Sequence, residues 1–156
     1  MNVKTESLGL DELRARWRTL MNAEPKLRIR AAAERLAVSE AQLVAAQCGA
    51  QATMLRAEPA AMLLDLRAWG HVMVLTRNDA FVHEREGRFE SVEIHGAMGL
   101  VLGPDIDLRC FLSQWVFAFA VHKETPRGAL RSVQFFDASG DAVFKVYLRD
   151  GGDDAE

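Results

Sequence analysis

The residue types best suited to chemistry lie together in the segment "DIDLRCFLSQWVFAFAV", residues 105–121. If this segment is a β-strand, alternate side chains share a face, so Asp107 and Arg109 lie in line with large aromatic rings. Those aromatic residues are Phe111, Trp115, Phe117 and Phe119. A guanidinium on an apolar face is costly unless an anion accepts its hydrogen bonds. The pattern therefore predicts either a strand-end ion pair between Arg109 and Asp107, or a site for a flat anionic ligand such as haem.

His83 is the histidine whose surroundings best suit a haem iron. In "AFVHERE" it follows Phe81 by two residues, so on a strand both side chains point to the same face. A neutral imidazole beside apolar walls is a competent axial ligand of haem iron. The simpler interpretation, an ordinary strand histidine, stays open. The other histidines lack the paired spacing of a zinc site and remain alternative iron ligands: His71, His95 and His122.

The composition describes one globular domain and argues against several functional classes. The 156 residues are 49% apolar and 26% charged, which suits a single compact core. A net charge of −3 gives no bulk reason to expect nucleic acid or an anionic membrane as partner. No segment approaches the roughly 18–20 apolar residues of a membrane span. Cys48 and Cys110 lack C-x-x-C spacing, so we expect reduced thiols and a cytoplasmic protein. The phosphate-binding and nucleophile motifs of common enzymes are missing.

The elements that must position these residues divide the chain in two. Apolar residues at helical spacing predict helices over most of residues 1–70, with Ser39 and Gln42 as a capping box and Pro59 in a first helical turn. From residue 71 the period becomes alternating, and short turns punctuate about six strands, which favours antiparallel neighbours. We expect the strand at 106–121 to be central, because both its faces are apolar.

The expected fold class is therefore α+β, with an N-terminal helical layer packed on a mainly antiparallel β-sheet. We expect one domain over residues 1–150, helical over 1–70 and a sheet over 71–149. The polar residues 151–156 predict a disordered tail.

An alternative function comes from the helix pair at 28–46, "RIRAAAERLAVSEAQLVAA", whose small residues and capped turn are similar to a helix-turn-helix. The second helix has no arginine or lysine to neutralise phosphates, so any DNA affinity would depend on Arg28, Arg30 and Arg35. We expect a helical hairpin that covers the sheet, and we keep a DNA-binding or regulatory module as the alternative.

The order of segments resembles a known family. The succession "LRARWRTL", "PKLRIRAAAERLAVSEAQLVAA", "TRNDAFVHEREGRFE", "HGAMGLVLGPDIDLRCFLSQWVFAFAV" and "SVQFFDASGDAVFKVYL" is similar to the N-terminal repeat of the cytoplasmic haemin-degrading and haem-trafficking family of the HemS/HmuS/ChuS type. The resemblance implies one repeat of the HemS-like fold. It also implies a bacterial haem-uptake protein for iron utilisation that carries haem b, degrades it, or both, with a haem importer or a haem oxygenase as possible partners.

The same resemblance implies roles for individual residues. The arginine of the family's "DLR-x-FL" motif, here Arg109, reaches the distal side of the haem, and the histidine of its "R-N-x-x-x-V-H-E" motif corresponds to His83. The haem-contacting residues expected here are His83, Arg109, Phe111, Trp115 and Phe117. No motif selects the residue that would hold the propionates among Lys123, Arg127, Arg131 and Lys145.

The chain also departs from the family. Typical members contain two tandem repeats, and the axial histidine of their best-established site lies in the second repeat. We therefore expect either one half of a longer protein, or a single-repeat form that pairs with a copy of itself as a homodimer. In both cases the isolated domain should expose apolar surface or self-associate.

Overall fold

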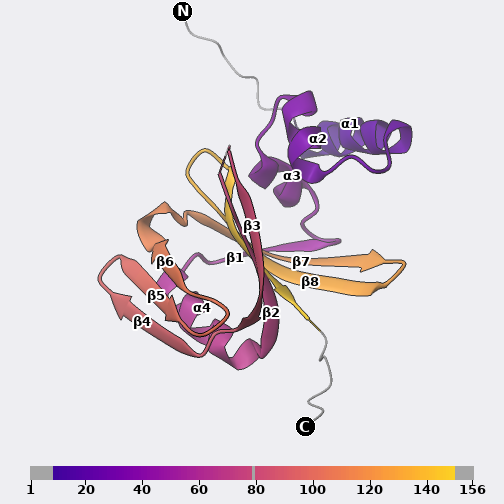
Figure 1. Ribbon diagram of the computed structural model, residues 1–156. Coiled ribbons are helices and arrows are strands. Elements are labelled where there is room, and N and C mark those ends of the chain that lie inside the picture. The colour runs from indigo at the N-terminus through magenta and orange to yellow at the C-terminus, as the bar shows by residue number, and fades with distance from the viewer. Residues whose placement is uncertain (1–8, 79, 150–156) are drawn as a thin grey trace, which may run out of the picture.

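The computed structural model describes residues 9–78 and 80–149, so the expected tail at 151–156 lies outside the described residues (Figure 1). The helices are α1 (Leu10–Ala23), α2 (Ile29–Leu36), α3 (Glu40–Ala46) and α4 (Pro59–Asp65), with short 3-10 helices η1 (Leu66–Trp69) and η2 (Leu112–Gln114). The strands are β1 (Ala52–Leu55), β2 (His71–Arg77), β3 (Val82–Arg88), β4 (Ser91–His95), β5 (Met98–Leu102), β6 (Leu108–Phe111), β7 (Phe117–Thr125), β8 (Gly128–Phe136) and β9 (Ala142–Leu148). The α+β class expected from the sequence is confirmed.

Helices α1, α2 and α3 form a small layer with its own apolar cluster. Its buried members are Leu13, Ala32, Ala33, Leu36, Leu43 and Ala46. Ala37 adopts a left-handed conformation with φ 56° and ends α2. The capping box expected at Ser39 and Gln42 is confirmed, with the Gln42 backbone N–H donating to Ser39 Oγ and the Ser39 backbone N–H donating to Gln42 Oε1. These local signals fix the direction in which α3 leaves the turn.

Helix α4 lies apart from this layer, against the strands β4 and β5 (Figure 1). Pro59 is its first residue, as expected, because that position needs no N–H donor. Leu63 and Leu66 are buried, and Met62 and Trp69 pack beside them, so the expected apolar face is confirmed. A Cβ added at Gly99 would lie 2.4 Å from Leu63 Cδ2, so only glycine lets β5 approach α4 this closely.

The strands form two antiparallel sheets rather than one. The larger has the order β1-β7-β8-β9-β2-β3, and the smaller has the order β4-β5-β6. Strand β1 comes from the half of the chain that the sequence predicts to be helical, and it pairs with β7 at the edge of the larger sheet. About six strands were expected within residues 71–149; the structure describes eight there, β2–β9, and the separation of β4–β6 into a second sheet was not foreseen.

The prediction of one continuous strand over 106–121 is wrong. Strand β6 ends at Phe111, where the backbone N–H of Leu112 makes a last bond to the β5 side by donating to Ala97 O at 2.8 Å. The 3-10 helix η2 follows, with the Trp115 N–H donating to Leu112 O at 3.1 Å. After η2 the chain enters the larger sheet as β7. Because η2 turns the chain between sheets, alternation along 106–121 does not place these side chains on one face. Strand β6 is an edge strand of the smaller sheet, and β7 is internal in the larger one.

The larger sheet has two unlike faces. One faces the smaller sheet and α4 through an apolar cluster built from Val72, Val74, Ala118, Val133, Phe135, Phe144 and Val146. The other, which we call the helix-facing side, meets α3 through Ala52, Phe119, Phe136 and Ala142. On that side β8 and β9 also present Ser132, Gln134 and Lys145, which are buried polar residues. The layers thus enclose one apolar core and one partly polar interface.

Candidate functional site

His83 lies on β3, the edge strand of the larger sheet, and its side chain is exposed. It lines a shallow cavity of about 250 Å³ together with apolar Val74, Ile106 and Leu108. Asp105 and Asp107 border the same cavity. This cavity can present the imidazole to an iron beside apolar walls, but it is smaller than the ~300–1,000 Å³ of typical ligand pockets.

The imidazole of His83 differs from the other three in having no glutamate partner within the described residues. The Nε2 atom of His71 lies 3.6 Å from Glu86, that of His95 lies 3.0 Å from Glu93, and that of His122 lies 2.8 Å from Glu124. An imidazole nitrogen engaged by a carboxylate must give up that contact before it binds a metal at the same atom. His83 is therefore the histidine most available to an incoming iron.

Arg109 and Phe111 lie on the outward side of β6, opposite buried Cys110. On the neighbouring strand β5, Leu100 pairs with Arg109 and Met98 pairs with Phe111. The Phe111 side chain is exposed over 59% of its surface. The ion pair between Arg109 and Asp107 that the sequence allowed is not formed within the described residues; Arg85 instead reaches Asp105, with its Nη2 3.0 Å from Asp105 Oδ1. Arg109 does not line the His83 cavity.

Trp115 is inside the core and is not part of an open face. Its ring centroid lies 4.4 Å from that of Phe135 and 4.8 Å from that of Phe144, and only 7% of its surface is exposed. Its ring is covered on the core side of the larger sheet and presents little surface to a ligand, so the contact between Trp115 and haem stays a prediction.

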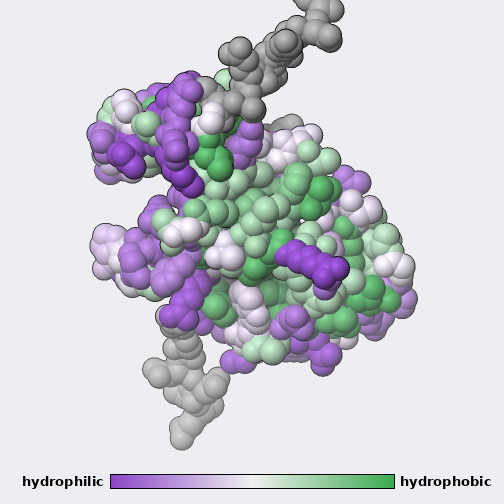
Figure 2. All heavy atoms as spheres, turned by 180° about the vertical axis from the view of Figure 1, so that it is seen from behind, coloured by the Kyte–Doolittle hydropathy of each residue, from purple (hydrophilic) through white to green (hydrophobic). Residues whose placement is uncertain are grey.

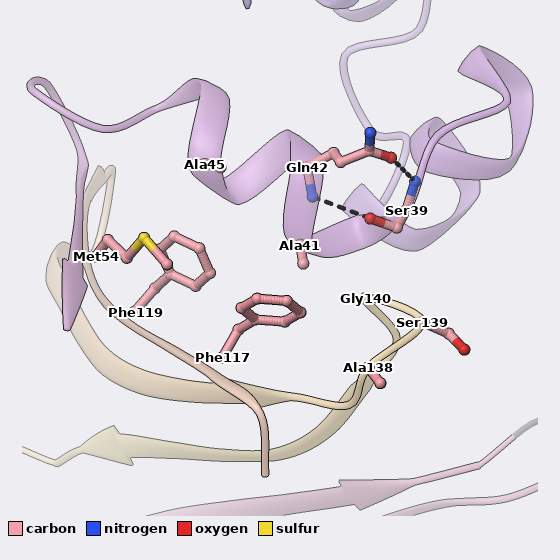
Figure 3. A pocket seen from close by; sticks show the side chains of 10 residues that line it. All are labelled: Ser39, Ala41, Gln42, Ala45, Met54, Phe117, Phe119, Ala138, Ser139 and Gly140. Carbon is pink, nitrogen blue, oxygen red and sulfur yellow. Dashed lines mark hydrogen bonds between the residues drawn. The ribbon is translucent and has the colours of Figure 1, made fainter. Parts of the chain in front are cut away.

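Phe117 lies on the other side of that sheet, in an apolar groove of about 440 Å³ beneath α3 (Figure 3). The rings of Phe117 and Phe119 and the side chain of Met54 form one wall, and Ala41 faces them from α3. At the end of the groove a Cβ on Gly140 would lie 2.4 Å from Ser39 Oγ, and Gly140 has φ +83°. The five residues expected at one haem site are thus distributed over separate surfaces.

A third cavity, which the sequence did not reveal, lies between α1–α3 and the helix-facing side of the larger sheet. We call it the helix–sheet cavity; its volume is about 390 Å³. Its cationic lining residues are Lys26, Arg28, Arg30, Arg77, Lys123 and Lys145. Two signals could have indicated it: Ser132 and Gln134 alternate with apolar residues on a strand expected to be covered on both faces.

A buried ion pair crosses from the helical layer to the floor of this cavity. Glu40, the first residue of α3, accepts a hydrogen bond from Lys145 Nζ on β9, and both side chains are almost fully buried. Among the other residues considered for the propionates, Lys123 lines the same cavity, whereas Arg127 and Arg131 are exposed on β7–β8. Lys145 is therefore already paired, and Lys123 remains open to a ligand.

No group of three or more His, Cys, Asp or Glu side chains within residues 9–78 and 80–149 is placed to hold a metal ion. In the same ranges no helix has both the length and the apolar character needed to cross a membrane.

Comparison with known proteins assigns the chain to a family. Residues 37–156 match the family model described as the haemin-degrading HemS/ChuX domain. The hemin transport protein HemS of Yersinia enterocolitica is 42% identical over 119 residues, which are 76% of this chain and 34% of HemS.

Two solved structures share the fold at substantial identity. Holo-PhuS, a heme-binding protein from Pseudomonas aeruginosa, superposes with a TM-score of 0.88 at 46% identity, covering 92% of this chain and 42% of PhuS. The heme-degrading enzyme ChuS of Escherichia coli O157:H7 superposes with a TM-score of 0.85 at 35% identity, covering 91% of this chain and 43% of ChuS. The chain thus spans between a third and a half of the length of these relatives. The match over residues 37–156 shows that this chain belongs to the haemin-degrading HemS/ChuX domain family.

Proposed function

We propose that this domain binds haem in a cytoplasmic step of bacterial haem uptake, in which haem is carried, degraded, or both, for iron utilisation. The observation that carries the proposal is the similarity to PhuS, a heme-binding protein, across nearly the whole chain. The similarity to HemS and ChuS, named for hemin transport and heme degradation, supports the same ligand.

The iron ligand in this proposal is His83. Its support is the unengaged imidazole and the apolar walls formed by Val74, Ile106 and Leu108. The cavity fits one side of a porphyrin only, and Asp105 and Asp107 disfavour propionates near it because like charges repel. The propionates would therefore point away from these carboxylates.

Arg109 and Phe111 have a complementary role in the proposal. Both are exposed on the outer side of the smaller sheet, away from the His83 cavity. They would contact a haem held by a paired domain, either a second copy of this chain or a second repeat. Arg109 would bond a propionate or an iron-bound anion, and Phe111 would stack on the ring.

The chain contributes binding rather than bond-making chemistry. Bound haem supplies iron-centred redox and oxygen chemistry. His83 would hold the iron, and the apolar walls would exclude water from one side of the ring.

The test is a haemin titration followed by visible absorption. We expect a Soret shift with wild type, its loss in His83→Ala, and a smaller change in Arg109→Ala. The matched controls are His95→Ala and Arg56→Ala, which remove an exposed histidine and an exposed arginine. An unchanged spectrum in His83→Ala would refute the ligand assignment while leaving haem binding intact, whereas no shift with wild type would refute haem binding by this domain.

Pairing of domains is part of the same proposal. Several large apolar side chains are exposed, and Figure 2 shows hydrophobic residues spread over much of one face of the molecule. The exposed residues include Met54, Phe81, Val82 and Phe111. Sedimentation should therefore show association at high concentration; a clean monomer that binds no apolar dye would contradict it.

The structure gives no support to the alternative of DNA binding. In α3, the helix that would enter a groove, Ala41, Leu43 and Val44 are buried against the sheet and the other helices. A recognition helix needs one free face with side chains that reach base edges. Binding that falls steeply with salt and is abolished by changing Arg28, Arg30 and Arg35 would revive the alternative.

A further inference from the structure

The helix–sheet cavity gathers polar atoms that lack partners. Within the described residues, the buried side-chain atoms without a hydrogen-bond partner are Trp17 Nε1, Arg77 Nε and Gln134 Oε1. All three residues line this one cavity. Buried polar groups are nearly always paired, so each exception requires a physical reason. Their concentration at one cavity indicates a ligand that completes their hydrogen bonds.

The charges around the cavity indicate the sign of that ligand. Six lysine and arginine side chains line it, and among the residues that the structure describes no aspartate or glutamate does, although the chain as a whole carries a net charge of −3. Glu40 neutralises Lys145, and Arg30 lies 3.7 Å from Glu34. After these two pairings, the lysine and arginine side chains that line the cavity still outnumber the two nearby carboxylates, Glu84 and Glu86 on the edge strand β3. Glu86 is also paired, because Arg149 Nε lies 3.2 Å from its Oε1. The cavity therefore favours an anion.

The unpartnered groups are mainly donors. Trp17 Nε1 and Arg77 Nε carry N–H groups and cannot accept a hydrogen bond. Gln134 Nε2 lies 3.0 Å from Ser132 Oγ; with the amide turned by 180°, the Ser132 hydroxyl donates to Oε1 and the NH₂ group faces the cavity. Each of these residues can then donate a hydrogen bond into the cavity.

Tyr147 adds another donor at the floor of the cavity. Burial raises the pKa of its phenol, and the carboxylates of Glu40 and Glu84 raise the pKa further. The hydroxyl therefore keeps its proton at neutral pH. Apolar residues complete the walls: Met21, Leu75, Val121 and Leu130.

We propose that the helix–sheet cavity binds a small organic anion, with its carboxylate or phosphate group held by Arg77 and the Trp17 indole N–H, and an apolar body against the sheet. A cavity of about 390 Å³ is near the lower end of the usual range for ligand pockets, which suits a small molecule. The site is separate from the His83 cavity, because His83 alternates with Glu84 along β3 and so points to the other side of the sheet.

The test uses 4-phenylbutyrate and phenyl phosphate as probes, with 4-phenylbutanol as the uncharged match of the first. Binding is followed by the indole N–H signals of the 15N-labelled protein, which has three tryptophans. Trp17→Phe assigns the Trp17 signal. We expect an anionic probe to move that signal and to leave those of Trp69 and Trp115 in place. The alcohol should bind at least ~10-fold more weakly. Carboxylate and phosphate ligands are distinguished by which probe binds more tightly.

Variants locate the anion. Arg77→Met should weaken binding by about 10-fold or more, and Lys123→Met, at the exposed rim, by a few-fold. Arg127→Met, at the exposed β7–β8 turn, is the matched control and should have no effect. Folding of each variant is checked by the unchanged signal of buried Trp115.

Three outcomes would overturn the proposal. The first is no shift with either probe at concentrations up to about 10 mM, which would leave only water in the cavity. The second is equal binding by Arg77→Met and wild type. The third is displacement of the probe by haemin, which would make this cavity the haem site. Failure of the wild type to bind haem, with anion binding intact, would refute only the haem proposal, so the two proposals fail independently.

Discussion

The two faces of the larger sheet differ in the kind of contacts that cover them. The face toward the smaller sheet is closed by aromatic packing of Trp115, Phe135 and Phe144. The helix-facing side has a buried ion pair and a cavity with unpaired donors. The first arrangement maximises apolar burial, and the second retains polar groups whose cost needs a compensating ligand or partner. The difference teaches that one sheet can supply stability on one side and a binding surface on the other.

The largest expected effect comes from opening the apolar face. Phe135→Ala removes a fully buried ring that contacts both Trp115 and Phe144, so we expect the free energy of unfolding to fall by ~3–5 kcal/mol. The matched control is Phe111→Ala, where the ring is exposed and the change should stay within about 0.5 kcal/mol. Urea denaturation measures both. Similar losses in the two variants would contradict the division into faces.

The next effect concerns the helix-facing side, where two variants compare what charge and what packing contribute to stability. Glu40→Gln leaves the buried ammonium of Lys145 without its anion, and we expect a loss of about 3 kcal/mol in the free energy of unfolding. The double variant Glu40→Leu with Lys145→Met replaces both charges by apolar groups, and its stability should return to within about 1 kcal/mol of wild type. If the double variant is as unstable as Glu40→Gln, the face depends on the ion pair itself.

The smallest effect concerns the two thiols, one beside each face. Burial raises the pKa of Cys110 from 9.0 to about 11. Below pH 9 both the folded and unfolded states keep this proton, so the thiol leaves stability unchanged. Between about pH 9 and 11 the unfolded state loses the proton first, and stability falls through this window. Cys110→Ala should show a shallower decline over the same range.

The same thiols allow a simpler check at neutral pH. A thiol reagent should label half-buried Cys48 in the native protein and reach buried Cys110 only when the protein opens. Cys48→Ala and Cys110→Ala assign the two rates. Faster labelling of Cys110 than of Cys48 would show that the apolar face is the looser of the two.

Local signals in the sequence were sufficient for the helical layer and for the fold class. Ser39, Gln42 and Pro59 act within one or two helical turns, so their residue types predict their structures. The break at Leu112 could not be predicted, because it comes where pairing with β5 runs out at Ala97, and the sequence of one strand does not show where its partner strand ends. Apolar residues on both sides of this break hid the change of sheet.

The candidate site was predicted less well for the same reason. The residues Arg109 and Phe111 do share a face, because they lie within one uninterrupted strand. Trp115 and Phe117 lie beyond the 3-10 helix, and they point to opposite sides of the larger sheet. The helix–sheet cavity joins Trp17 with Tyr147, and no periodicity in the sequence connects residues so far apart.

The Glu40–Lys145 pair also has a consequence for synthesis on the ribosome. The two residues are 105 positions apart, so at ~5–20 residues per second Lys145 is added about 5–20 s after Glu40. During that interval α1–α3 can assemble their own small cluster, but the carboxylate that α3 later buries has no cation to meet. In that interval α3 can meet Ala52, Phe119 and Phe136 of the strands made earlier, but the Glu40 carboxylate keeps its hydration until β9 supplies Lys145.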